Sequence, residues 1–89
     1  MITIWKQTLQ IVDEQFIEVP KGSELLSVQV QNGEPQVWFK CDSEALKVYV
    51  RIRIYGTGNP ISPCEGEKYL STFQVMGGQL VFHVFYTNA

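Results

Sequence analysis

The chain has few of the residues on which metal sites and disulfide frameworks depend. Its 89 residues include one histidine and two cysteines, Cys41 and Cys64. Metal ions are normally held by clusters of His, Cys or carboxylate side chains, and disulfide scaffolds need more than two cysteines. The sequence therefore predicts no metal site, no cofactor and no disulfide framework. Cys41 follows the alternation of a predicted strand and is expected to be a buried thiol, whereas Cys64 falls in a loop.

Long apolar runs are also missing. No run approaches the ~20 residues that a membrane-spanning helix needs. Residues 1–6 lack the charged region followed by an apolar region that is typical of a signal peptide. We therefore expect a soluble cytoplasmic protein that does not enter a membrane.

Basic residues are not in excess. Seven lysines and arginines face nine aspartates and glutamates, which leaves a formal net charge of −2. General DNA or RNA binding is not expected, because it depends on basic groups that displace counterions. A hydrophobic share of 45% excludes disorder, and the length predicts one domain over residues 1–89. A domain this short buries only about 60–65% of its unfolded surface, so it often gains stability by oligomerising.

Helical periodicity is absent, and nearly every segment alternates with a period of two residues. Within one such segment, Leu26, Val28 and Val30 alternate with polar residues, and Asn32-Gly33 and Gly77-Gly78 are signals for tight hairpin turns. Seven short strands at this spacing predict an all-β fold, a single small antiparallel β-sandwich or closed barrel. The expected strands are 2–9, 15–19, 25–31, 36–42, 47–55, 68–76 and 79–86.

Residues 47–55 form the most informative segment. Successive strand side chains point to opposite faces, so one row of this segment is expected to line a core. That row consists of Val48, Val50, Ile52 and Ile54. The other row consists of Lys47, Tyr49, Arg51, Arg53 and Tyr55. Two guanidinium groups among aromatic rings suit an anionic, planar ligand or a hot-spot surface for a protein partner.

Trp38 and Lys40 have the outward phase of the preceding strand. If the two strands pair, these side chains are cross-strand neighbours of Tyr49 or Arg51. An aromatic ring beside a guanidinium can hold a base while the arginine binds a phosphate. Each stacked base contributes about 1–3 kcal/mol in single-strand binders. The alternative is a solvated strand face whose long side chains cover a neighbouring sheet.

A glycine loop follows this strand. It lacks the Gly-Lys-Ser/Thr of a P-loop, and no helix follows it. Its backbone N–H groups can form an anion-binding nest, or the glycines can serve only a strand exit that needs positive φ at Gly56 or Gly58. The predicted ligand-binding residues are therefore Trp38, Lys40, Tyr49, Arg51, Arg53, Tyr55, Gly56, Thr57, Gly58 and Asn59.

The last strand is apolar on both faces apart from His83. A strand of this kind lies in the middle of a sandwich or at a subunit interface, and we expect a homo-oligomer in which Val81, His83 and Phe85 lie at the interface. Nucleophilic catalysis needs a nucleophile beside a base that a third group orients. We expect a hydrogen-bonded structural role for His83, no catalytic residue and no enzyme activity.

Several segments together are similar to a known family. They are Trp5-Lys6, 17–22, 26–31, Trp38, 55–61, 69–72 and 78–85. The chain resembles, over almost its whole length, a family of small uncharacterised proteins from bacteriophages and bacteria that is classed as a domain of unknown function. Its Gly-Thr-Gly and Leu-Val-Phe-His-Val-Phe segments are the most specific. The resemblance implies no catalytic residue. In a phage setting it suggests a counter-defence protein that sequesters a nucleotide signal in the host cytoplasm.

The expected function is a non-catalytic, homo-oligomeric binding protein for a small anionic molecule that contains a base. Arg51 and Arg53 would bind phosphate, Trp38 and Tyr49 would stack on the base, and residues 55–59 would donate backbone hydrogen bonds. The alternative is a protein-interaction module that presents the same Arg, Tyr and Trp side chains to a host or phage protein. A third hypothesis, a hydrolase of such a ligand, requires His83 beside a pocket.

Overall fold

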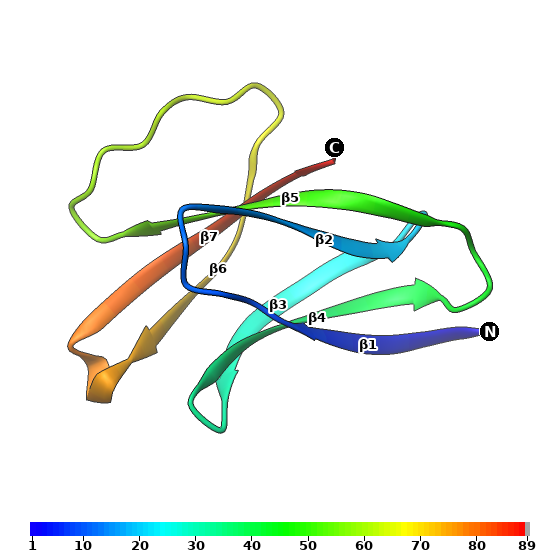
Figure 1. Cartoon of the computed structure of the whole chain (residues 1–89), viewed down its shortest axis with the longest axis horizontal. Helices are drawn as coiled ribbons and strands as arrows, with labels where there is room; N and C mark the ends of the chain where they lie inside the picture. Colours follow the sequence, from blue (N-terminus) through cyan, green and yellow to red (C-terminus); the bar gives the residue numbers. More distant parts are fainter. Residues whose placement is uncertain (89) are drawn as a thin grey trace.

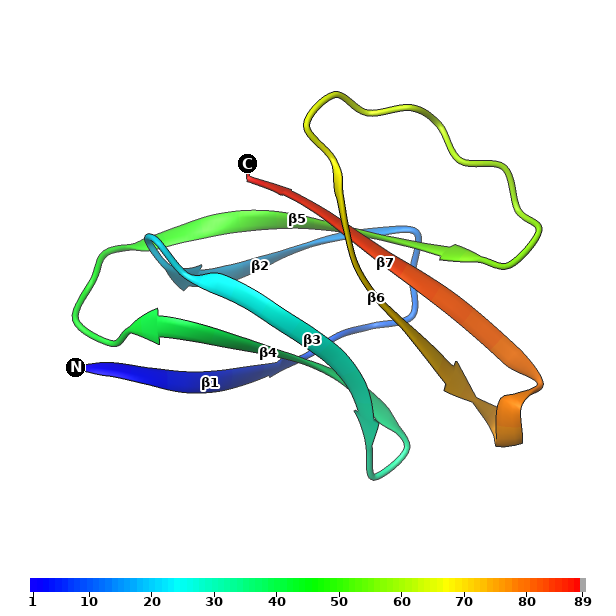
Figure 2. The same ribbon diagram turned by 180° about the vertical axis from the view of Figure 1, so that it is seen from behind.

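The computed structural model describes residues 1–88, which form seven strands in two antiparallel sheets packed face to face (Figures 1 and 2). This confirms the predicted all-β class. One sheet has the order β1-β4-β3 and consists of Ile2–Thr8, Glu34–Asp42 and Glu24–Gln31. The other has the order β2-β5-β7-β6 and consists of Glu14–Pro20, Lys47–Gly56, Leu80–Asn88 and Lys68–Val75.

The core lies between the two sheets and is built from alternate strand positions. Val37 on β4, Ile52 on β5 and Val84 on β7 are completely buried. On β5 the neighbours of Ile52, Arg51 and Arg53, point to the outer face of the four-stranded sheet and are only partly covered. The predicted division of this strand into an apolar row and a cationic–aromatic row is therefore confirmed.

β3 departs from the predicted alternation because it contains a β-bulge. Its register with β4 shifts between Leu25 and Ser27. Leu25 consequently packs against the core, as does Val28, whereas Leu26 is 42% exposed. Grouping Leu26 with Val28 on one face was wrong, since the extra residue of a bulge reverses the phase of the strand.

The connections follow the turn signals of the sequence. Asn32 and Gly33 both adopt positive φ (53° and 82°), as a tight hairpin turn requires. A single 3₁₀ turn, η1 (Met76–Gly78), links β6 to β7. The longest irregular segment is 57–67, between β5 and β6, which is the wide yellow-green loop in Figure 1. Residues 1–88 contain no helix that is long and apolar enough to cross a membrane.

The bulge can be tested by the same substitution at two adjacent leucines. We expect Leu25→Ala to lower the free energy of unfolding by about 2 kcal/mol, because Leu25 packs against the core. Leu26→Ala should lower it by less than about 1 kcal/mol, since Leu26 is exposed. Urea unfolding followed by circular dichroism measures both values. The reverse order would contradict the bulge.

Candidate functional site

A hollow of about 460 Å³ opens where the outward side chains of β5 meet the loop that follows the strand. The beginning of β2 forms its other wall, where Asp13 and Glu14 lie. The structure brings five of the ten predicted ligand-binding residues to this hollow. They are Arg51, Arg53, Tyr55, Gly56 and Asn59.

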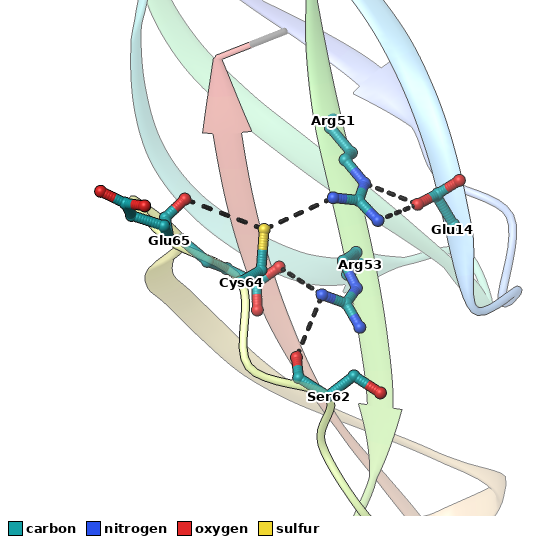
Figure 3. A network of polar contacts seen from close by, with 7 residues as sticks. Glu14, Arg51, Arg53, Ser62, Cys64 and Glu65 are labelled. Carbon is teal, nitrogen blue, oxygen red and sulfur yellow. Dashed lines mark hydrogen bonds and ion pairs between the residues drawn. The ribbon is translucent and has the colours of Figure 1, made fainter.

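Arg51 lies between two partners that come from opposite sides (Figure 3). Its Nε and Nη2 atoms both contact Oε2 of Glu14 on β2, and its Nη1 atom donates to Sγ of Cys64 at 3.4 Å. The hydrogen bond with Glu14 raises the pKa of Arg51. Arg51 therefore joins the edge strand β2 and the long loop to the middle of the sheet.

Arg53 fastens the same loop at two further points. Its Nη1 atom donates to the carbonyl oxygen of Ser62 at 3.3 Å and to Oε2 of Glu67 at 3.4 Å. The Arg53 and Glu67 side chains are only 13% and 7% exposed, so this ion pair is largely shielded from water. The loop, not a cavity, is the principal partner of this guanidinium.

Tyr55 packs between Arg53 and Phe85 on the outward face of the sheet. Its ring lies under the guanidinium of Arg53, at 5.0 Å from the centroid, and meets the Phe85 ring edge-on at 5.7 Å. Its hydroxyl group is buried and has no hydrogen-bond partner within residues 1–88. Burial raises the pKa of Tyr55, and the negative charge of Glu67 raises it further. Because the Arg53 guanidinium and the Phe85 ring already contact the Tyr55 ring, Tyr55 is a poor stacking surface for a ligand.

The glycine loop is a tight turn. The Asn59 N–H donates to the Gly56 carbonyl at 3.1 Å, and Gly58 has a φ of 88°, as the third position of a type II turn requires. The Thr57 N–H donates to the Val81 carbonyl at 3.2 Å. The predicted strand exit with positive φ is therefore confirmed at Gly58. The predicted ligand contacts by backbone donors are wrong for Thr57 and Asn59, whose N–H groups bind the chain itself.

Trp38, Lys40 and Tyr49 lie away from the hollow. Trp38 and Lys40 are on the outer face of the three-stranded sheet, because β4 pairs with β1 and β3. The condition for their contact with Tyr49 or Arg51, that this strand pairs with β5, is not met, since the chain crosses to the second sheet after Asp42. Tyr49 does share the outward face with Arg51, but it lies nearer the start of β5, opposite Glu18, and is 55% exposed.

The sequence analysis did not predict two acidic residues of the site, Asp13 and Glu14. Glu14 stands opposite Arg53 in the β2–β5 register, and it reaches diagonally to Arg51. The carboxylates of Asp13 and Glu14 balance the two guanidinium charges, so these four lining residues carry no net charge. The available signal was a pair of acidic residues directly before the predicted strand 15–19, but the partner of that strand was unknown.

His83 lies in a chain of hydroxyl groups on the outward face. Thr57 Oγ1 is 2.7 Å from its Nε2 atom, and Thr72 Oγ1 is 3.0 Å from its Nδ1 atom. The Tyr69 hydroxyl continues the chain at 2.7 Å from Thr72. Both ring nitrogens of His83 therefore have partners, which link β7 to β6 and to the turn after β5, and this agrees with the predicted structural role.

The residues predicted for a subunit interface have partners within the chain. The Phe85 ring packs between the rings of Tyr55 and Tyr69, with centroids 5.7 and 5.5 Å away. His83 is bound as described above, and Val81 is half-buried. The apolar character of β7 thus has an explanation within one chain. Within residues 1–88, no group of three or more His, Cys, Asp and Glu side chains is placed to hold a metal ion.

Comparison with known proteins gives one match. A family model described as a domain of unknown function (DUF7352) matches residues 1–89, which confirms the resemblance to an uncharacterised family over the whole chain. No curated protein and no solved structure gives a significant match.

The fastening role of Arg53 can be tested by proteolysis. We expect Arg53→Ala to raise the rate of cleavage after Glu65 by about tenfold, because the loop loses its contacts through Ser62 and Glu67. A glutamate-specific protease with mass spectrometry measures the rate. Lys40→Ala, an exposed charge on the other sheet, is the control. An unchanged rate in Arg53→Ala would show that the loop is held by other contacts.

The buried hydroxyl of Tyr55 predicts a dependence of stability on pH. Its folded pKa is raised, so above about pH 10 the unfolded chain loses this proton first and the folded state loses stability. Tyr55→Phe should remove this part of the alkaline loss. At pH 7 it should change the free energy of unfolding by less than about 1 kcal/mol, because the hydroxyl has no hydrogen-bond partner among the described residues. Denaturation at pH 7 and above about pH 10 measures the change in the free energy of unfolding, with Tyr49→Phe as control.

Proposed function

We propose that this chain, which belongs to the family described as a domain of unknown function (DUF7352), is a non-catalytic binding protein for a small nucleotide-type ligand. The observation that carries the proposal is the hollow of about 460 Å³ that gathers two guanidinium groups and two carboxylates. This volume lies within the range of roughly 300–1,000 Å³ that is typical of ligand pockets.

Arg51 is the group best suited to bind the anionic part of the ligand. Its ion pair with Glu14 is open to solvent, with side chains 31% and 44% exposed, so the pair is weak and an incoming phosphate can replace the carboxylate at small cost. A guanidinium binds phosphate oxygens through two parallel donors. Arg53 is less available, because its pair with Glu67 is largely buried.

Asp13 suits the other part of the ligand, because it lines the same hollow and is not the carboxylate that the phosphate displaces from Arg51. Carboxylate oxygens accept hydrogen bonds from the amino and imino groups of a nucleobase. The predicted stacking on Trp38 and Tyr49 is not supported, since both rings lie elsewhere. Because the lining carries both charge signs, it favours a ligand with an anion and N–H donors over inorganic phosphate.

We extend the proposal to the sequestration of a nucleotide signal. This role requires only that the protein binds the nucleotide. It rests on the resemblance to phage and bacterial proteins, in which a small accessory protein would act against host defence in the host cytoplasm. Both ring nitrogens of His83 are hydrogen-bonded to threonine hydroxyl groups of the chain, which supports binding without turnover.

A protein partner is the second candidate, and one observation favours it. Phe16 and Tyr49 are 53% and 55% exposed on the outward face of β2 and β5, and Phe16 stands opposite Arg51 in the register. Exposed aromatic residues beside arginine are typical of hot spots in protein interfaces. Trp38 is not part of this surface, because it lies on the other sheet.

The proposal predicts opposite effects of two substitutions at one ion pair. We expect Arg51→Gln to weaken the binding of a cyclic dinucleotide or an ADP-ribose derivative by at least about tenfold. Glu14→Gln should tighten the binding several-fold, because it removes the carboxylate that competes for Arg51. Calorimetric titration of the folded protein against a panel of these ligands measures both. Glu18→Gln, on the same strand, is the matched control.

The absence of heat with every ligand of the panel would refute nucleotide binding. A protein captured in stoichiometric amount, and lost in Phe16→Ala and Tyr49→Ala, would then establish the second candidate. If the first proposal is correct, the same two variants bind the nucleotide as the parent chain does.

A further inference from the structure

Two of the four edge strands of this sandwich cover each other. β3 and β6 lie at the edges of different sheets and pack together, and the Ser71 hydroxyl on β6 donates to the Val28 carbonyl on β3 at 3.0 Å. An edge strand presents unpaired N–H and C=O groups that can pair with another chain, so natural edges are covered or otherwise blocked. This corner of the molecule satisfies that rule.

The edge strand β2 is blocked by its own side chains. Its hydrogen-bonding phase follows from two bonds in the register with β5: Lys21 N–H donates to the Leu46 carbonyl at 2.6 Å, and Ile54 N–H donates to the Asp13 carbonyl at 3.1 Å. The backbone N–H and C=O groups of the odd-numbered residues of β2 therefore bond to β5. Those of the even-numbered residues point to the free edge. Carboxylates and a proline, which lacks an N–H, protect such an edge. The free positions are Glu14, Phe16, Glu18 and Pro20.

The edge strand β1 lacks this protection. The Ser43 N–H donates to the Met1 carbonyl and the Leu9 N–H donates to the Pro35 carbonyl, both at 2.9 Å, so odd-numbered residues of β1 bond to β4. The even-numbered residues then present their N–H and C=O groups to the free edge, which no described strand covers. These residues are Ile2, Ile4, Lys6 and Thr8.

The side chains of β1 favour an apolar contact at this edge. Ile2 and Ile4 are 63% and 56% exposed on the outer face. Lys6 is the only charged residue of the strand, and its ammonium group reaches back across the sheet to Gln31 on β3. The apolar surface continues inward from Ile4, since this residue, Leu26 and Trp38 line a shallow groove.

We propose that β1 is the interface of a symmetric dimer. The β1 strands of two copies pair antiparallel across the free edge and join the two three-stranded sheets into one continuous sheet. The proposal is independent of the nucleotide site, because the hollow beside Arg51 lies on the other sheet. It also differs from the interface predicted on β7.

A second copy fits this edge because the strand is complementary to itself. With Ile4 opposite Ile4 of the second copy, Ile2 of each chain faces Lys6 of the other, and each facing pair exchanges two backbone hydrogen bonds. The isoleucines of both copies then meet at the centre of the ladder. The two lysines lie at opposite ends, about 13 Å apart along the strand direction, so like charges do not oppose each other.

Proline substitutions at two free edges test the interface. We expect sedimentation velocity to give a mass of two chains for the parent protein and of one chain for Ile4→Pro, which removes a donor that β4 does not use. Phe16→Pro is the matched control on β2, where the N–H is also free, and it should remain a dimer. Circular dichroism verifies that each variant is folded.

A charge swap provides a second test that leaves the backbone intact. Ile4→Lys and Ile4→Glu should each weaken the dimer by about tenfold or more, because like charges then face each other at the centre of the ladder. Mixing the two variants should restore the dimer. A monomeric parent protein at all concentrations would overturn the proposal, whether or not a strand of another protein binds this edge. Ile4→Lys and Ile4→Glu variants that dimerise like the parent would overturn it as well.

Discussion

The two-residue alternation of β5 is the constraint on which the rest of the structure depends. This strand lies between β2 and β7, so both of its edges are paired, and Ile52 anchors its inner face in the core. The same geometry turns Arg51 and Arg53 outward, away from the core. A one-residue slip of β5 would bury both guanidinium groups, so the pairing of the sheets and the placement of the site share one cause.

The outward arginines organise the surface of the four-stranded sheet. Arg51 joins β2 to the loop, and Arg53 holds the loop through a largely buried ion pair with Glu67. The two ion pairs differ in exposure, and this difference matters for function. An exposed pair exchanges partners easily, whereas breaking a buried pair leaves an uncompensated charge. The loop is thus held at Arg53, while Arg51, whose ion pair is exposed, is the guanidinium that can exchange its partner.

The edges of the two sheets explain why one side of the molecule is suited to association. β3 and β6 cover each other, and β2 carries two glutamates and a proline at its free positions. Of the two edges that remain, β1 carries exposed isoleucines at two of its free positions and neither a carboxylate nor a proline there, whereas Phe16 on β2 stands between two glutamates. The hollow beside Arg51 and the proposed interface are consequently on different sheets, and neither obstructs the other.

The sequence by itself determined the seven strands, the Asn32-Gly33 turn and the two faces of β5, because these features depend on local alternation and turn geometry. It did not determine the bulge at Leu25, the sheet to which Trp38 belongs, or the partners of the arginines. Glu14 lies 37 positions from Arg51, and Glu67 lies 14 positions from Arg53. Such contacts depend on which strands pair and in which register, and this choice is made by packing the whole chain around one core.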